Sequence, residues 1–433
     1  MSLIQSAPLS ETVAALRSGA LDLLAYVESA VDRLEQVDAE VQAFLPEPGR
    51  RERLRREAAA LAAGFPDPAA RPPLYGALIG VKDIFRVDGF ETRAGSTLSP
   101  TLFEGAEAAV VTQLKRLGAL VLGKTVTAEF AYFEPGPTRN PHNLAHTPGG
   151  SSSGSAAGVA AGLVPLALGT QTIGSIVRPA SYCGIVGYKP SYGRLSTEGV
   201  LPVSKALDHV GLFTQDIDGM ALAASLLCAD WRPAGEVERP RLGVLTGAYL
   251  AQASDEMIAA FDGWVARLEQ AGFSVQRLDM LDDIETIGDQ CRKLMAYEAA
   301  QVHAGWFAAY SEQYRPRTAG LIQTGQSVSA EIAAEARAAQ MNVRRRVEDA
   351  MREAGIDVWI SPAAAGPAPH GLESTGAPWM NLLWTFIGLP AVTMPAGRSA
   401  DGLPLGLQMA GAYGDDERLL AWAGVVGRTL KQE

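Results

Sequence analysis

The chain has 433 residues, of which 47% are hydrophobic and 20% charged, and its formal net charge at pH 7 is −11. This composition predicts a folded globular protein and excludes a disordered chain. The negative balance argues against nucleic-acid binding through a broad basic face, and no apolar stretch is long enough to span a membrane. Three cysteines without metal-ligand spacing predict no disulfide framework, so the expected location is a reducing cytoplasm.

The first third of the chain alternates between helical and strand-like patterns. Apolar spacing predicts helices near Leu9, over residues 21–34, within 46–73 and over 110–117. Short apolar runs predict buried strands over 78–81, ending near Lys82, and over 119–123. Helices that alternate with strands are typical of an α/β sheet protein.

Residues 134–155 form a long segment without periodicity, rich in Pro, Gly, Asn and Ser. Such a stretch inside a compact domain is usually functional. A helix is predicted over 155–162, although Gly158 and Gly162 each cost about 1 kcal/mol relative to alanine. These glycines indicate that the helix lies very close to another backbone. A strand over 166–168 then delivers residues 169–175 as a turn.

The second half contains stronger helix signals. Helices are predicted over residues 254–271, 284–310, 329–354 and 416–430, and Gly272 is the expected stop of the first. Strands are predicted over residues 241–245, from 273 onward, and over 357–362, 388–395 and 405–409. No internal repeat is visible.

Two Gly/Ser-rich segments carry serines 24 positions apart, Ser151 and Ser175. A serine hydroxyl is a poor nucleophile without a base, and none of the five histidines lies in either segment. Lys82 follows a buried strand, where burial favours the neutral amine that can act as a base. Lys124 follows another short strand and is the second candidate. Taken alone, a Gly/Ser run is more often a flexible turn, and a lysine more often a surface charge.

Rival motifs fit the first Gly/Ser segment less well. Residues 150–154 satisfy G-x-S-x-G, which would make Ser152 the nucleophile, but that motif requires a preceding strand. The preceding residues include Pro141 and Pro148 and cannot form a central strand. A phosphate-binding loop is weaker still, because no Gly-Lys-Ser/Thr follows the glycines. The histidines form no metal-ligand set, so no metal site is expected.

Several motifs, in order along the chain, resemble the amidase signature family. They are Gly80–Asp83, Arg139–Asn143, Pro148–Ala157, Gly169–Ile176, Cys183–Pro190, Gly388–Ala391 and Asp401–Gln408. The resemblance spans nearly the whole chain and is weakest between about residues 230 and 350. It implies an α/β fold, with a single large domain and a mixed, mostly parallel sheet sandwiched between helices. The implied segments are N-terminal helices (1–75), a catalytic core (76–230), a variable substrate-pocket region (231–350), and closing strands and helix (351–433).

The resemblance also implies a catalytic set that uses no cofactor. Ser175 would be the nucleophile, Ser151 the proton relay that follows a cis peptide bond, and Lys82 the base. An oxyanion hole would be formed by the backbone N–H groups of Thr172, Ile173, Gly174 and Ser175. The hydrogen-bond network would be supported by the hydroxyls of Ser152 and Thr170. The implied reaction is hydrolysis of a linear amide through an acyl-enzyme.

The nucleophile turn departs from the common family pattern at three positions. That pattern has Asp where this chain has Gln171, Gly where it has Ile173, and an arginine one position before Arg178. The turn is most similar to the malonamidase-like branch, in which this arginine binds the substrate carboxylate. The resemblance therefore implies a substrate-binding role for Arg178 and a small, carboxylate-bearing amide. The alternative for Arg178 is a structural ion pair or the capping of carbonyl groups.

Three functions stay open at this point. The first is an amidase that acts on a small-molecule amide, without nucleic-acid or membrane partners. The second is the amidase subunit of a tRNA-dependent glutamine amidotransferase complex. The third is a catalytically silent binding protein, against which the intact Lys82, Ser151 and Ser175 argue. The interpretation also leaves a homodimer open.

Overall fold

One sheet runs through the whole molecule. The computed structural model describes residues 2–431, so residue 1 of the expected N-terminal segment and residues 432–433 of the closing segment lie outside the described part. The strands are β1 (Leu78–Lys82), β2 (Leu120–Thr125), β3 (Leu166–Gln171), β4 (Val186–Lys189), β5 (His209–Thr214), β6 (Leu242–Leu245), β7 (Val275–Leu278), β8 (Val358–Pro362), β9 (Ala391–Arg398) and β10 (Pro404–Ala410). Their spatial order is β2-β1-β3-β5-β4-β9-β10-β8-β6-β7.

The sheet is mixed, as expected, but the expectation of mostly parallel pairing is wrong. Parallel pairs occur only toward the two ends, where β1 joins β2 and β3, and β6 joins β7 and β8. Every pair from β3 across to β8 is antiparallel. The reason is visible between β9 and β10, which are connected by residues 399–403 alone. So short a connection can join antiparallel neighbours but cannot make the crossover that parallel strands need.

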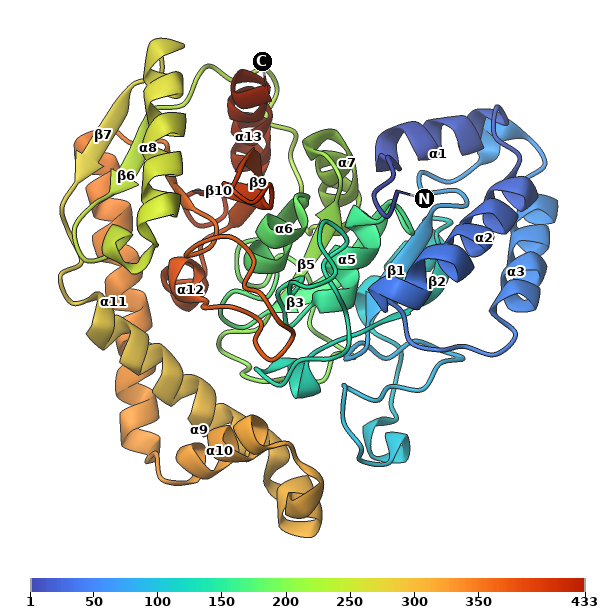
Figure 1. Ribbon diagram of the computed structural model, residues 1–433, viewed down its shortest axis with the longest axis horizontal. Helices are drawn as coiled ribbons and strands as arrows, with labels where there is room; N and C mark the ends of the chain where they lie inside the picture. Colours follow the sequence, from blue (N-terminus) through green and yellow to red (C-terminus); the bar gives the residue numbers. More distant parts are fainter. Residues whose placement is uncertain (1, 432–433) are drawn as a thin grey trace.

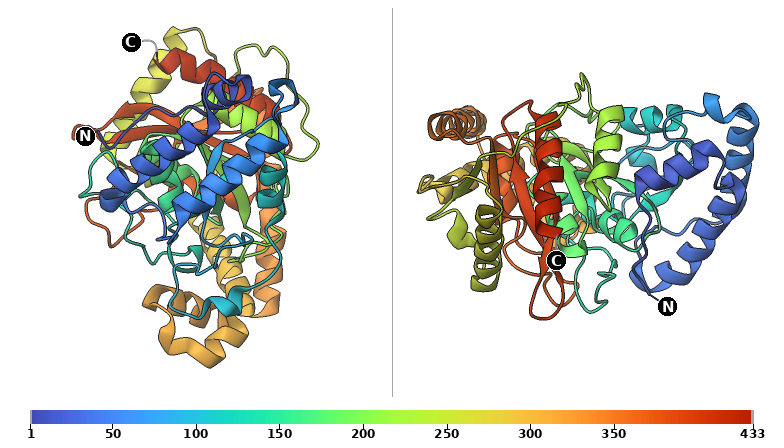
Figure 2. Two further views of the ribbon diagram at one scale, coloured as in Figure 1. Left: turned by 90° about the vertical axis from the view of Figure 1, so that its right-hand side faces the viewer. Right: turned by 90° about the horizontal axis from the view of Figure 1, so that it is seen from above.

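Helices cover both faces of the sheet (Figures 1 and 2). They are α1 (Leu9–Ser18), α2 (Leu23–Val41), α3 (Arg50–Gly64), α4 (Ala109–Arg116), α5 (Ser153–Ala160), α6 (Val177–Cys183), α7 (Ile217–Leu227), α8 (Asp255–Gln270), α9 (Ile284–Tyr310), α10 (Pro316–Gln326), α11 (Ala330–Ala354), α12 (Trp379–Phe386) and α13 (Asp416–Lys431). Within the described residues, none of these helices is long and apolar enough to cross a membrane.

Neighbouring residues of β1 pack into different hydrophobic cores, because successive side chains of a strand point to opposite faces. Ile79 and Val81 belong to a core that includes residues of α4, α7 and α13. Leu78 belongs to a second core with α2, α3 and α5. The expected sandwich of helices around a central sheet is therefore confirmed.

The long helices of the second half begin and end within a residue or two of the predicted positions. Ser254 accepts a hydrogen bond from the Met257 N–H at the start of α8, and Ser329 accepts one from the Ile332 N–H at the start of α11. Gly355 ends α11 with φ 64°, a left-handed conformation that costs glycine little. These capping residues give strong local signals, so the sequence predicted these helices well.

The glycine-containing helix after the Ser-rich segment was predicted over residues 155–162 and spans Ser153–Ala160. α5 is buried on all sides, which leaves little space for side chains. A Cβ atom on Gly154 would lie 2.1 Å from the carbonyl oxygen of Ala43 and 2.4 Å from the backbone nitrogen of Val126. Of the two glycines on which the prediction rested, Gly162 would place a Cβ atom 2.5 Å from the carbonyl oxygen of Gln5, whereas the nearest atoms to Gly158 belong to the Phe44 side chain. The close approach to another backbone therefore holds at Gly162 and also occurs at Gly154, but not at Gly158.

Helices α9, α10 and α11 form an arm that projects from the sheet (Figure 1). The arm is held by the loop over residues 129–135. The Glu129 carboxylate accepts a hydrogen bond from the Arg315 N–H at 3.1 Å, and the Glu134 carboxylate accepts one from the Arg317 N–H at 2.6 Å. Both N–H groups stand at the start of α10, where a helix has no internal acceptors for them. The loop and the arm are thus fixed to each other.

Candidate active site

Lys82 lies at the end of β1 and is completely buried. Its Nζ atom donates hydrogen bonds to the hydroxyl oxygens of Ser151 and Thr170, both at 2.8 Å. Burial holds the pKa of Lys82 well below the usual lysine value, and the Asp208 carboxylate opposes this effect only in part. The structure therefore brings together the predicted lysine and serine, and it favours a neutral amine that can accept a proton.

Ser151 and Ser152 lie at the entry to α5 and have different surroundings. The peptide bond between Gly150 and Ser151 is cis. The Ser152 hydroxyl donates to the Thr170 carbonyl oxygen at 3.2 Å and accepts from the Thr170 N–H at 3.3 Å. Ser152 is fully buried, and residues 141–152 contain no strand. The geometry therefore gives Ser152 a supporting position against β3 and gives no basis for a nucleophile elbow.

Ser175 lies in the turn between β3 and α6. The sequence predicts a turn from residue 169, but β3 continues to Gln171 because its pairing with β5 extends to His209. Ser175 is 8% exposed and lines a narrow cavity. The wall of this cavity also includes Ala131, Tyr132, Phe133, Arg178, Val203, Met295 and Pro378.

The turn leaves a row of backbone donors beside Ser175. Among the hydrogen bonds of residues 2–431, none is donated by the backbone N–H groups of Thr172, Ile173, Gly174 and Ser175. The next two N–H groups, those of Ile176 and Val177, donate to the Gln171 side-chain oxygen at 2.8 and 3.0 Å. Free N–H groups next to a serine are the arrangement that can stabilise an oxyanion.

Arg178 is buried in the wall of the same cavity, one turn after Ser175. One nitrogen, Nη2, donates to the Gly150 carbonyl oxygen at 2.5 Å and to the Thr375 hydroxyl at 3.3 Å. The other two, Nε and Nη1, have no hydrogen-bond partner. Burial lowers the pKa of Arg178 to about 10, and the ion pairs of the described residues do not include this side chain. The structure therefore gives no support to a structural ion pair, whereas the carbonyl contact uses only part of the guanidinium.

Known proteins resemble this chain along almost its whole length. The family model described as Amidase matches residues 25–420. The chain belongs to the amidase family. The amidase is 32% identical over 440 residues to the AtzE subunit of 1-carboxybiuret hydrolase from Pseudomonas sp. (strain ADP), with 93% of each protein covered. It is 30% identical over 479 residues to a glutamyl-tRNA(Gln) amidotransferase subunit from Thermus thermophilus, covering 95% of the amidase and 94% of that relative.

Solved structures share the fold of the amidase. One, described as "Crystal structure of amidase", has a TM-score of 0.87 at 30% identity and covers 97% of the amidase and 99% of that chain. Another belongs to "An unexpected vestigial protein complex reveals the evolutionary origins of an s-triazine catabolic enzyme", with a TM-score of 0.87, 29% identity and 98% coverage of both chains. Together with the family membership, these likenesses identify an amidohydrolase and argue against a catalytically silent binding protein.

The second candidate base, Lys124, is occupied elsewhere in the amidase. Its Nζ atom forms a buried ion pair with Asp83 at 2.8 Å and donates to the Thr92 hydroxyl at 3.2 Å. Burial lowers the pKa of Lys124, while the Asp83 charge works in the opposite direction. A lysine engaged with a carboxylate favours its charged form, so Lys82 is the better placed base.

Sequence reasoning missed Asp208, which holds the nucleophile turn through Thr172. The Thr172 hydroxyl donates to Asp208 Oδ1 at 2.6 Å, and Oδ2 accepts from the N–H groups of Val203 and Ser204 at 2.8 and 3.0 Å. Burial raises the pKa of Asp208 to about 6. The available signal was the family-like run over residues 207–211, in which nothing distinguishes the carboxylate from a solvated one.

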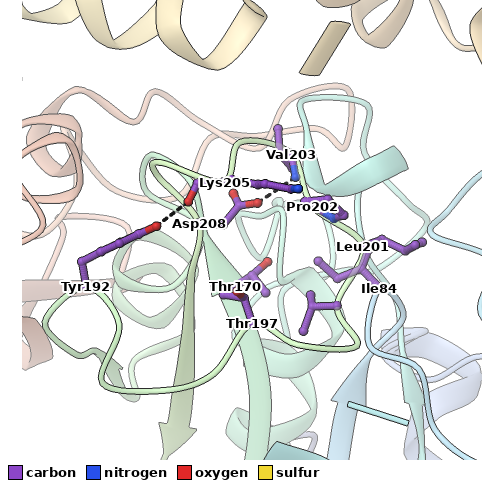
Figure 3. A pocket seen from close by; sticks show the side chains of 10 residues that line it. Ile84, Thr170, Tyr192, Thr197, Leu201, Pro202, Val203, Lys205 and Asp208 are labelled. Carbon is purple, nitrogen blue, oxygen red and sulfur yellow. Dashed lines mark hydrogen bonds between the residues drawn. The ribbon is translucent and has the colours of Figure 1, made fainter. Parts of the chain in front are cut away.

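Asp208 and Thr170 also line a second, wider cavity (Figure 3). It borders the Ser175 cavity, since Val203 lines both. The rest of its wall is formed by Ile84, Tyr192, Thr197, Val200, Leu201, Pro202 and Lys205. The end of β3, which lies beside Lys82 and leads into the turn with Ser175, is thus flanked by two hollows.

The histidines of the amidase contact backbone or aromatic groups. His142 and His146 lie at 2.9 and 2.8 Å from the carbonyl oxygens of Cys183 and Ala368. Within the described part of the chain, no three His, Cys, Asp or Glu side chains are grouped to hold a metal ion. The geometry of these residues therefore offers no alternative base for either serine.

Proposed function

We propose that the amidase hydrolyses the C–N bond of a small linear amide that carries a carboxylate. The supporting observation is Arg178, a buried guanidinium with two unpartnered nitrogens in the wall of the Ser175 cavity. A buried charge without a counter-charge is costly, and a guanidinium N–H donates a strong, charge-assisted hydrogen bond to a carboxylate. The relative named as the AtzE subunit of 1-carboxybiuret hydrolase acts, by its name, on a carboxylated amide.

Acylation begins when the Ser175 hydroxyl oxygen attacks the amide carbon. Its proton passes to Ser151, while the Ser151 proton passes to the lone pair of neutral Lys82, a step supported by the 2.8 Å contact between these two side chains. The oxyanion that forms accepts hydrogen bonds from the backbone N–H groups of residues 172–175. Lys82 then returns the proton through Ser151 to the leaving nitrogen, the C–N bond breaks, and an ester on Ser175 remains.

Deacylation repeats these steps with water. Water gives up a proton through Ser151 to Lys82 and attacks the ester carbon. The new tetrahedral intermediate uses the same N–H donors, and its collapse returns the proton to the Ser175 oxygen. The net reaction converts one amide and one water into one carboxylic acid and one amine. Lys82 alternates between neutral and charged forms, so activity requires its neutral state at the start.

Labelling with a fluorophosphonate probe tests the assignment of the nucleophile. The wild type and Ser152→Ala are expected to be labelled, whereas Ser175→Ala is expected to be neither labelled nor active. Ser152→Ala is the matched control because Ser152 lies in the rival motif and is fully buried. Full activity of Ser175→Ala on every amide that the wild type cleaves would falsify the mechanism.

A matched substrate panel tests the substrate class. Malonamic, succinamic and glutaramic acids are compared with neutral amides in which an isopropyl group replaces the carboxylate, such as isocaproamide for succinamic acid. We expect kcat/KM, measured from ammonia release, to be at least about 10-fold higher for one of the acids, as suits a charge-assisted hydrogen bond. Equal values for each acid and its neutral partner contradict the proposed class.

A second candidate function is the amidase subunit of a tRNA-dependent amidotransferase. It is supported by the 30% identity to the glutamyl-tRNA(Gln) amidotransferase subunit from Thermus thermophilus. The nucleophile turn speaks against it, because Gln171, Ile173 and Arg178 depart from the usual pattern of that branch. Glutaminase activity that arises only with aminoacyl-tRNA and partner subunits, together with no activity on the acid panel, would favour this second function.

A further inference from the structure

Helix α12 contacts the nucleophile turn through two side chains that lie one helical turn apart. The Thr385 hydroxyl donates to the Ile173 carbonyl oxygen at 2.6 Å. A Cβ atom on Gly174 would lie only 2.5 Å from the side-chain oxygen of Asn381, so this helix packs closely against the turn. Thr385, Asn381 and the turn are all buried. A helix more than 200 residues away in the sequence therefore supports the peptide between Ile173 and Gly174.

Gln171 donates a hydrogen bond to the Thr385 hydroxyl oxygen and thereby orients the hydroxyl proton toward another acceptor. A hydroxyl has one proton to donate, and Gln171 Nε2 donates to the Thr385 oxygen at 2.8 Å. The proton has two acceptors in reach, the Ile173 carbonyl at 2.6 Å and the Asn381 carbonyl at 3.2 Å. The shorter distance favours Ile173. The side-chain oxygen of the same Gln171 accepts hydrogen bonds from the N–H groups of Ile176 and Val177.

Because the Ile173 carbonyl and the Gly174 N–H belong to one planar peptide, the contact with Thr385 also orients the Gly174 N–H. In a trans peptide the C=O and N–H bonds point in opposite directions. The Ile173–Gly174 bond is trans, since the cis bond among the described residues joins Gly150 and Ser151. Holding the Ile173 oxygen against α12 therefore directs the Gly174 N–H away from that helix. Gly174 lines the Ser175 cavity, and its N–H has no acceptor among residues 2–431.

The supporting helix is itself tied to the sheet. The Asn381 side-chain nitrogen donates to the Ala363 carbonyl oxygen at 2.9 Å and to the Gln408 side-chain oxygen at 3.0 Å. Gln408 lies in β10 and also donates to the Met380 carbonyl oxygen at 3.0 Å. The Thr385 hydroxyl is thus presented by a helix whose place is set by two further elements, as precise positioning requires.

We propose that Thr385 and Gln171 are positioning residues that aim the Gly174 N–H at the oxyanion of the reaction. The proposal rests on the proposed function, in which Ser175 attacks and the turn supplies the oxyanion donors. The oxyanion exists in the tetrahedral state and not in the bound substrate. Loss of the aim therefore lowers kcat and leaves KM nearly unchanged.

The test compares Thr385→Val, which removes the hydroxyl at nearly constant volume, with Thr385→Ser, which keeps it. With succinamic acid, we expect Thr385→Val to lower kcat about 10- to 100-fold and to change KM less than about threefold, since loss of a whole oxyanion donor costs about 100- to 1,000-fold. Thr385→Ser is expected to stay within about threefold of the wild type. A boronic acid that forms a tetrahedral adduct with Ser175 should bind Thr385→Val more weakly by the same factor as kcat, which a merely structural loss would not produce.

A second variant keeps the test decisive if Thr385→Val does not fold. Gln171→Glu retains oxygen acceptors for Ile176 and Val177 but has no N–H for Thr385, and its carboxylate draws the Thr385 proton away from Ile173. We expect the same selective fall in kcat. The proposal is overturned if either folded variant keeps kcat within about threefold, or if kcat falls while boronic acid affinity is unchanged. Activity of Ser175→Ala would instead overturn the proposed function itself, so the two failures are distinguishable.

Discussion

Replacing Arg178 provides the sharpest test of how this amidase selects its substrate. Its Nε and Nη1 atoms are buried without partners and lie on different edges of the guanidinium, so a substrate carboxylate can receive a charge-assisted hydrogen bond from one of them. Such a bond is worth about 1.5–3 kcal/mol. At 1.4 kcal/mol for each factor of ten, Arg178→Met should lower kcat/KM for succinamic acid by about 10- to 100-fold through this contact alone.

The variant also removes a contact that has nothing to do with the carboxylate. Arg178 Nη2 donates to the carbonyl oxygen of Gly150, the residue before Ser151. Loss of that bond, about 1 kcal/mol, should lower the rates for succinamic acid and isocaproamide alike. The informative quantity is therefore the ratio of the two kcat/KM values. Arg178→Lys keeps the charge but not the fork and should restore only part of the ratio. Equal losses for both amides would refute the reasoning.

Other predictions concern the base and the serines. Because Lys82 must be neutral to accept a proton, kcat/KM should fall as the pH drops through its lowered pKa, and a profile flat into acid contradicts this. At a pH between that lowered pKa and the usual lysine pKa, Lys82 is protonated in the unfolded chain but neutral in the folded protein. The wild type should therefore gain stability over Lys82→Met by about 1.4 kcal/mol per pH unit as pH rises, in urea unfolding; a constant difference refutes the depressed pKa. Lys124→Met should destabilise the fold by about 3–5 kcal/mol by stranding the buried Asp83 carboxylate, yet keep kcat within about threefold per folded molecule; a greater loss of kcat makes Lys124 the base. Ser152→Ala should retain a kcat within about tenfold of the wild type, and a loss as deep as that of Ser175→Ala would reopen the elbow motif.

The sequence predicted elements whose signals are local. Helix α9 was placed at residues 284–310 by periodicity alone, and Ser254 and Ser329 marked the starts of their helices through short-range capping. Strands β4 and β5 received no prediction, because they are buried on both faces and lack an alternating pattern. Strand polarity also depends on which strands become neighbours, and that choice is made by contacts distant in sequence.

The same distinction applies to the site. A lysine after a buried strand and a serine in a glycine-rich segment pointed to Lys82 and Ser151, and these side chains lie in contact. Thr385 carried no motif, because its importance comes from meeting Ile173 across 212 positions. The free nitrogens of Arg178 were likewise invisible in the sequence, since only the fold shows which neighbours a buried group lacks.

The hydrogen bonds between the loop over 129–135 and the start of α10 have a consequence for the way such enzymes diversify. The residues proposed to react stand at the end of β1, just before α5 and in the turn after β3, whereas Met295 in the cavity wall belongs to α9. Tyr132 and Phe133 also lie in that wall. They belong to the loop whose Glu129 and Glu134 carboxylates are hydrogen-bonded to the start of α10, so their position is linked to that of the arm. Part of the cavity wall is therefore carried by a stretch of the chain separate from the residues proposed to react, while Arg178 stays beside Ser175. Exchanging residues 284–354 and the loop together between relatives is a route to new substrates that leaves the reacting groups in place.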